Sequence, residues 1–197
     1  MTTLDERPWL AATFDRGEVE HMREVFQPLS VGGEVGLEQM LVGEVDRVVS
    51  NLGNLVGWFD NPRDRDRYAV PMLGHLVELL REHAATWPGS PEHLHFAYHV
   101  VMETAYKLRA DPAWLEVAVW AAREQVAIGP EVAADMRAKY PGADLPGHGG
   151  YQRLVILADK SRDDGEVIRL CEQASAEGWA GNWDERIAKA TKRLGAG

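Results

Sequence analysis

The sequence has 197 residues, 45% of them hydrophobic, with 31 acidic against 21 basic residues and a formal net charge of -10. This length and apolar content allow a buried core, whereas the acidity, with no basic cluster, argues against binding to nucleic-acid phosphates. Cys171 is the only cysteine, which excludes an internal disulfide, and no apolar run reaches the roughly 20 residues that span a bilayer. The N-terminal stretch is acidic where a secretory signal is basic, so we expect a cytoplasmic protein with no membrane or nucleic-acid partner.

Apolar residues three and four positions apart predict two long helices in an N-terminal region, residues 1–90. The first covers about residues 34–59, and its apolar stripe is Leu37, Leu41, Val45, Val48, Leu52, Leu55 and Phe59. Three glycines interrupt it, each at a cost of about 1 kcal/mol relative to alanine in a helix interior: Gly43, Gly53 and Gly57. They indicate either close packing of a neighbour or a break near Gly53. The second helix covers about residues 64–86.

Residues 91–197 show the same helical spacing with clear start signals. Ser90-Pro91 and Asp111-Pro112 place a capping side chain before a proline at the first helical position. The predicted helices cover about residues 91–109, 112–129, 150–162, 164–178 and 182–194, with a short helix through Ala133 and Met136. Strict apolar–polar alternation is too short anywhere to predict a strand. The predicted fold class is therefore all-α, built from antiparallel helical hairpins with short connections.

One C-terminal hairpin places large, medium and small residues in a familiar order, at Tyr151, Leu154, Ala158, Val167, Cys171 and Ala174. With these residues, the stretch YQRLVILADKSRDDGEVIRLCEQASAEGW resembles a tetratricopeptide repeat. The preceding hairpin is similar through Tyr98, Val101, Ala105 and Pro130. The two hairpins are separated by more than the repeat length of about 34 residues, because an inserted loop occupies 129–150. Residues 92–194 also resemble uncharacterised bacterial helical-repeat proteins. The resemblance implies a right-handed stack of hairpins in the C-terminal half.

In such repeats the first helix of each hairpin lines a concave groove that holds an extended or helical peptide. The resemblance places seven residues along this groove: His99, Glu103, Tyr106, Lys107, Gln152, Asp159 and Lys160. Lys107 and Lys160, with Arg153, are the cations available for a carboxylate clamp, which is a common device in these proteins. We therefore expect a non-enzymatic protein that binds a protein or peptide partner through this groove.

The histidines allow other interpretations of the same helix. His95, His99 and Glu103 follow one another at steps of four, and with His75 from the preceding helix they could hold Zn, Fe or Mn. The simpler interpretation is that these histidines pack at a hairpin interface and donate hydrogen bonds to carbonyls. A third hypothesis is a homodimer whose seam is the glycine-bearing helix at 34–59. Cys171 lies on the packed side of its helix, which favours a buried residue over a nucleophile.

Overall fold

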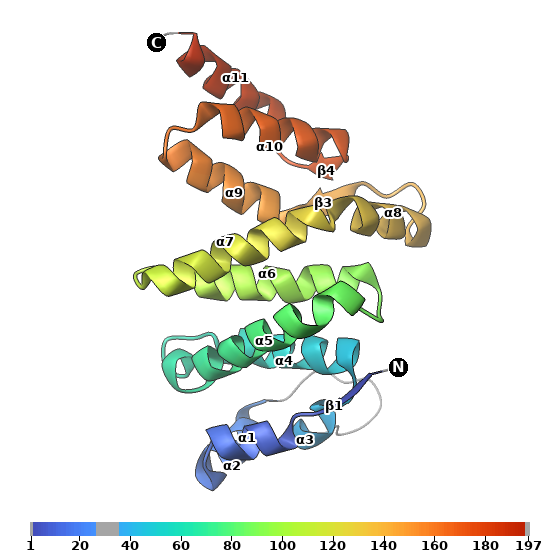
Figure 1. The fold of residues 1–197 in the computed structure, drawn as a ribbon, viewed down its shortest axis with the longest axis vertical. Helices are drawn as coiled ribbons and strands as arrows, with labels where there is room; N and C mark the ends of the chain where they lie inside the picture. The colour runs from blue at the N-terminus through green and yellow to red at the C-terminus, as the bar shows by residue number, and fades with distance from the viewer. Residues whose placement is uncertain (1, 27–35, 196–197) are drawn as a thin grey trace. The chain divides into compact units, whose positions relative to one another are not determined.

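The computed structural model describes residues 2–26 and 36–195, and helices account for most of them. The predicted all-α class is confirmed at this level (Figure 1). The chain divides into two compact units, Met1–Thr104 and Ala105–Gly197. The division falls inside helix α6, Pro91–Lys107. No helix of the described residues is long and apolar enough to cross a membrane.

The first unit begins with short elements and continues into longer helices. Its elements before α6 are β1 (Thr3–Asp5), α1 (Arg7–Thr13), α2 (Arg16–Val25), α3 (Leu37–Met40), β2 (Val42–Glu44), α4 (Val45–Phe59), the π-helix η1 (Arg65–Ala69), α5 (Val70–His83) and the 3₁₀-helix η2 (Ala84–Thr86). Helix α2 starts at a capping box, because the Asp15 carboxylate accepts from the Glu18 amide while Glu18 accepts from the Asp15 amide. Helices α4 and α5 pack together through buried apolar faces.

The single helix predicted over 34–59 is wrong, because strand β2 separates α3 from α4. Residues 34 and 35 of that prediction lie outside the described residues. The break occurs at Gly43, whose φ of +142° lies in a region that favours glycine over other residues. A Cβ added at Gly43 would also overlap the Arg47 guanidinium. Gly53 does not break α4, and no described heavy atom lies within 4 Å of a Cβ added at Gly53 or Gly57. Gly53 therefore marks neither a break in the helix nor the close packing of a neighbour.

The second unit follows the predicted helices closely. Its elements after α6 are α7 (Pro112–Ala127), α8 (Gly129–Lys139), β3 (Leu145–Gly147), α9 (Gly149–Lys160), α10 (Asp164–Ala176), β4 (Trp179–Ala180) and α11 (Trp183–Leu194). The Asp111 carboxylate accepts from the Ala113 amide, and the Asp163 carboxylate accepts from the Glu166 amide, so side chains cap both α7 and α10.

The expectation that the chain has no strands is wrong. β1 pairs antiparallel with β2, and β3 pairs parallel with β4. Each strand is only two or three residues long, which is too short to show an alternating pattern in sequence. The pairs close connections between helices and do not form a sheet core.

The core of the second unit lies between α9 and its neighbours. α9 packs against α7 and α10, and α10 packs against α11; in Figure 1 the α9–α10 and α10–α11 connections lie at opposite ends of the helices. Cys171 is buried in this core, as predicted, and burial raises the pKa of its thiol. A Cβ added at Gly150 would lie 2.7 Å from the Ala122 carbonyl oxygen, so α7 and α9 meet at a glycine. The tetratricopeptide-like stacking itself stays a prediction.

Candidate functional site

A groove runs over α9 in the second unit, with α7 and α10 on either side. This α7–α9–α10 groove has a volume of about 560 Å³ and is lined by Leu115, Val119, Arg123, Val126, Leu154, Leu157, Ala158, Ser161, Asp163, Glu166, Arg169, Leu170 and Gln173. The residues from α7 lie three or four positions apart, which places them on one face of that helix. Apolar side chains form much of the surface, and charged side chains come from α7 and α10.

A second pocket shares part of its lining with the groove. It has a volume of about 550 Å³ and is lined by Tyr106, Lys107, Arg109, Ala110, Leu115, Leu157 and Lys160. Leu115 and Leu157 line both cavities and are partly buried. The two cavities are therefore neighbours that share these leucines. We call the second one the Tyr106 pocket.

Positive charge gathers around the ring that gives this pocket its name. The Lys160 ammonium donates a 3.1 Å hydrogen bond to the Tyr106 hydroxyl. The Arg153 guanidinium carbon lies 3.8 Å from the ring centroid and that of Arg109 lies 4.6 Å from it, both within the range of cation–π attraction. The Lys160 hydrogen bond, and then the charges of Lys160, Arg153 and Arg109, hold the pKa of the Tyr106 phenol below its ordinary value.

Charges at the α10 side of the groove are compensated within the protein. The Glu166 carboxylate pairs with the Arg169 guanidinium at 2.6 Å, and Arg169 also donates to the Gln173 amide oxygen at 3.2 Å. By contrast, neither Arg109 nor Lys160 pairs with a carboxylate of residues 2–26 or 36–195. The groove thus has a neutralised side and a positively charged end.

Three of the seven predicted groove residues, Tyr106, Lys107 and Lys160, line the Tyr106 pocket together. Asp159 lines neither cavity and instead accepts a 2.6 Å hydrogen bond from Arg193 of α11. Gln152 is exposed and also lines neither cavity. His99 and Glu103 are partly buried on α6 in the first unit.

Sequence reasoning did not select Arg109, Leu115 or Leu157 for the site. Arg109 follows Tyr106 by three positions, the spacing at which residues near a helix end can meet, and this signal was available. The two leucines carried no such signal, because they come from two different helices and an apolar residue on a helix face is usually core.

The described residues do not assemble the alternative metal site, which comprised His75, His95, His99 and Glu103. No group of three or more histidine, cysteine, aspartate or glutamate side chains among residues 2–26 and 36–195 could hold a metal ion. His95 is buried. His75 contacts the Glu6 carboxylate at 2.6 Å and stacks on the Trp9 ring at 4.1 Å, so its imidazole holds the N-terminal segment against α5.

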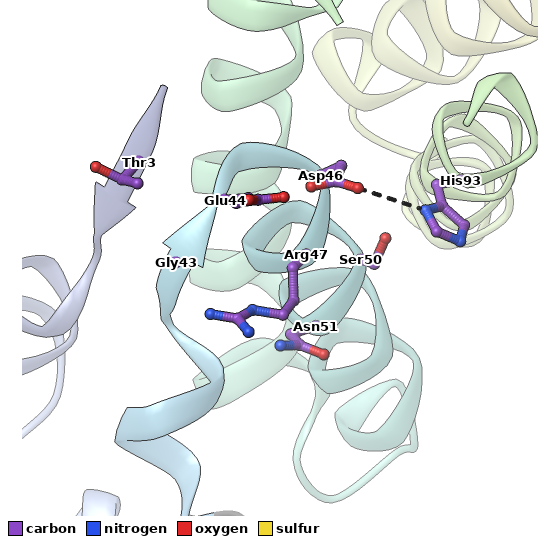
Figure 2. Close-up of a pocket in the computed structure, with 8 residues that line it drawn as sticks. All are labelled: Thr3, Gly43, Glu44, Asp46, Arg47, Ser50, Asn51 and His93. Carbon is purple, nitrogen blue, oxygen red and sulfur yellow. Dashed lines mark ion pairs between the residues drawn. The ribbon is translucent and has the colours of Figure 1, made fainter. Parts of the chain in front are cut away.

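The first unit has a polar pocket of its own, shown in Figure 2. It has a volume of about 600 Å³ and is lined by Thr3, Gly43, Glu44, Asp46, Arg47, Ser50, Asn51 and His93. Two of these side chains support the local backbone. Arg47 donates to the Val42 carbonyl at 2.9 Å, and Asn51 donates to the Met40 carbonyl at 2.8 Å.

Three other residues of this pocket belong to types that form hydrolytic triads. Asp46 lies 3.8 Å from Nδ1 of His93. In Figure 2, however, the other ring nitrogen of His93 points away from Ser50. A triad needs that nitrogen to accept the serine proton, so this geometry does not activate Ser50.

The face of α4 that carries a buried Gly53 and an exposed Gly57 bears on the predicted homodimer. Trp58 and Phe96, in the first unit, have 44% and 51% of their surfaces exposed, and Gly53, Phe96 and Ala97 line a cavity of about 210 Å³. Nothing among the described residues identifies what covers this face, and the homodimer stays a prediction. Sedimentation over a dilution series tests it, because a monomer at every concentration excludes it.

No protein-family model, curated protein or solved structure matches this chain.

Proposed function

We propose that this chain is a non-enzymatic helical-hairpin protein that binds a peptide or an extended segment of a partner protein in the α7–α9–α10 groove. The observation that carries the proposal is that two neighbouring cavities, about 560 and 550 Å³, share Leu115 and Leu157 in their linings. The tetratricopeptide-like stacking and the cytoplasmic, bacterial setting expected from the sequence are parts of the same proposal.

The dimensions of the groove suit a short peptide. From Leu115 to Val126 the α7 wall is about 16 Å long, at a rise of about 1.5 Å per residue, which matches roughly five residues of extended chain. The partly buried leucines offer an apolar surface, while Arg123, Glu166 and Gln173 offer polar contacts around it. An apolar centre with a polar rim is the usual anatomy of a protein interface.

Selection of random heptapeptides on the purified full chain, followed by affinity measurement for an enriched peptide, tests the proposal. Val119→Gln, which changes a groove residue on α7, should weaken binding by about tenfold, since it removes apolar contact and adds a polar group. Val117→Gln is the matched control, because Val117 is also partly buried on α7 but does not line the groove. Equal losses in both variants, or no enriched peptide at all, would contradict the proposal.

A further inference from the structure

We infer that the peptide carries a carboxylate, and that this carboxylate binds in the Tyr106 pocket between Arg109 and Lys160. The inference rests on the proposed function and specifies which class of peptide the groove accepts. It commits the site to acidic peptides, in which a carboxylate lies next to apolar side chains that occupy the groove at Leu115 and Leu157.

The first support is charge. The chain carries a net charge of -10, yet three cationic groups converge on one tyrosine ring. The guanidinium carbons of Arg153 and Arg109 lie 3.8 and 4.6 Å from the ring centroid, and the Lys160 ammonium donates to the ring hydroxyl at 3.1 Å. Arg109 and Lys160 pair with no carboxylate of the described residues, so a bound anion would relieve the repulsion between their like charges.

The second support is the inventory of available donors. Arg109 uses one terminal nitrogen for the Tyr106 carbonyl at 2.9 Å, and Lys160 uses one hydrogen for the Tyr106 hydroxyl. A guanidinium has five N–H donors and an ammonium has three. Both side chains are exposed, and so retain donors for a carboxylate. Charge-assisted hydrogen bonds of this kind are the stronger class.

The third support is the asymmetry along the groove. At the α10 side, Glu166 neutralises Arg169 at 2.6 Å, so an acidic peptide residue gains little there. The Tyr106 end, where Arg109 and Lys160 pair with no carboxylate of the described residues, therefore favours negative charge more than the Glu166–Arg169 pair does, and Leu115 and Leu157 adjoin it. The arrangement sets the order of the peptide: a carboxylate at one end, then apolar residues.

The experiment uses two random heptapeptide libraries on the full chain, one with free C-termini and one followed by a neutral linker. We expect an acidic residue beside apolar residues in peptides from the linker library. Enrichment only in the free-C-terminus library, of peptides with apolar C-terminal residues and no required acidic residue, identifies the main-chain carboxylate as the group bound. Both results support the inference and distinguish the two sources of the carboxylate.

A charge-reversal variant tests the location. Arg109→Glu with Lys160→Glu should exchange the acidic preference for a basic one, and Lys160→Gln alone should weaken an acidic peptide by roughly tenfold, the worth of about one charge-assisted hydrogen bond. Lys189→Glu with Lys192→Glu is the matched control, because these two exposed residues of α11 line neither cavity and change the net charge equally. Circular dichroism and thermal unfolding establish that each variant is folded.

The outcomes separate this inference from the proposed function. Peptides enriched without a carboxylate, or an acidic preference that persists in the folded charge-reversal variant, would overturn the inference and leave the groove as a binding site. Failure to enrich any peptide in either library would overturn the proposed function and the inference with it.

Discussion

The Lys160 ammonium donates a 3.1 Å hydrogen bond to the hydroxyl of Tyr106, a residue 54 positions earlier in the chain. This bond, with the guanidinium groups of Arg109 and Arg153, places positive charge beside the ring. The bond also makes the Tyr106 pocket detectable by tyrosinate absorbance, because a phenol beside positive charge loses its proton more easily than one in water.

Tyr106 should ionise at a lower pH than an ordinary tyrosine. The Lys160 hydrogen bond, with the nearby charges of Arg153 and Arg109, holds the pKa of Tyr106 below its usual value of 10.0. In an alkaline titration followed by tyrosinate absorbance, Tyr106→Phe should remove the earliest step, and Lys160→Gln should move that step to higher pH. Tyr140→Phe, at an exposed tyrosine, is the control. An early step that survives Tyr106→Phe would contradict the described surroundings of this ring.

Tyr151→Phe should destabilise the fold by about 1.5–3 kcal/mol, the usual range for a hydrogen bond to a charged group. The Tyr151 hydroxyl donates to the Glu177 carboxylate at 2.7 Å, and burial, then this bond, raises the pKa of the phenol, so that it remains a donor. Denaturant unfolding measures the change. Tyr140→Phe should stay within about 0.5 kcal/mol of the unsubstituted chain, since Tyr140 is 58% exposed; equal effects at both tyrosines would count against the Tyr151–Glu177 bond.

Gly150→Ala should cost about 1–3 kcal/mol, typical of overpacking. The added Cβ would lie 2.7 Å from the Ala122 carbonyl oxygen and 2.9 Å from the Gln125 amide oxygen, and would therefore push α9 away from α7. Gly57→Ala is the contrasting substitution, because nothing described lies within 4 Å of its Cβ. In a helix interior that exchange should stabilise by up to about 1 kcal/mol. If both variants shift the free energy of unfolding in the same direction, the described α7–α9 approach is incorrect.

Acid should loosen α11 before the rest of the second unit. Arg193 donates to Asp159 at 2.6 Å and to Asp164 at 2.7 Å, and its bond to Asp159 lowers the pKa of that carboxyl from 3.8. Because the folded state holds this proton less tightly than the unfolded chain, the pairing stabilises the fold above pH 3.8 and loses that effect as the pH falls through the lowered pKa. As the pH falls, hydrogen exchange of the α11 amides, corrected for intrinsic rates, should accelerate before exchange in the rest of the second unit.

The variant Arg193→Gln isolates this effect. It should abolish the additional acid sensitivity of α11 and raise the pKa of Asp159. Arg186→Gln, on the same helix, removes a hydrogen bond to the neutral Asn182 side chain, and should leave the acid sensitivity in place. Identical exchange profiles for the two variants would show that Arg193 does not hold α11 in this way.

Helices with strong local signals could be predicted from the sequence. Asp111 before Pro112, and Asp163 at the start of α10, are caps whose side chains accept backbone hydrogen bonds, and such signals are local. The same reasoning applies to α2, whose Asp15–Glu18 capping box is present in the sequence, although no helix was predicted there.

Features set by distant partners could not be predicted in this way. The break at Gly43 accompanies pairing with Leu4, some 40 positions earlier in the chain, and a three-residue strand has no periodicity of its own. Within the site, Tyr106, Lys107 and Lys160 were predicted because the tetratricopeptide-like resemblance places them on the first helices of two hairpins, and they line one pocket. The junction of Leu115 with Leu157 depends on the packing of α7 against α9, which no local pattern reports.

Chemical-shift mapping of the full chain with a selected acidic peptide tests the central claim most directly. The account predicts that leucine methyl signals of Leu115 and Leu157 shift with peptide concentration, while signals from the polar pocket around His93 do not. Saturable shifts confined to the first unit, or none at the two leucines despite measured binding, would contradict it.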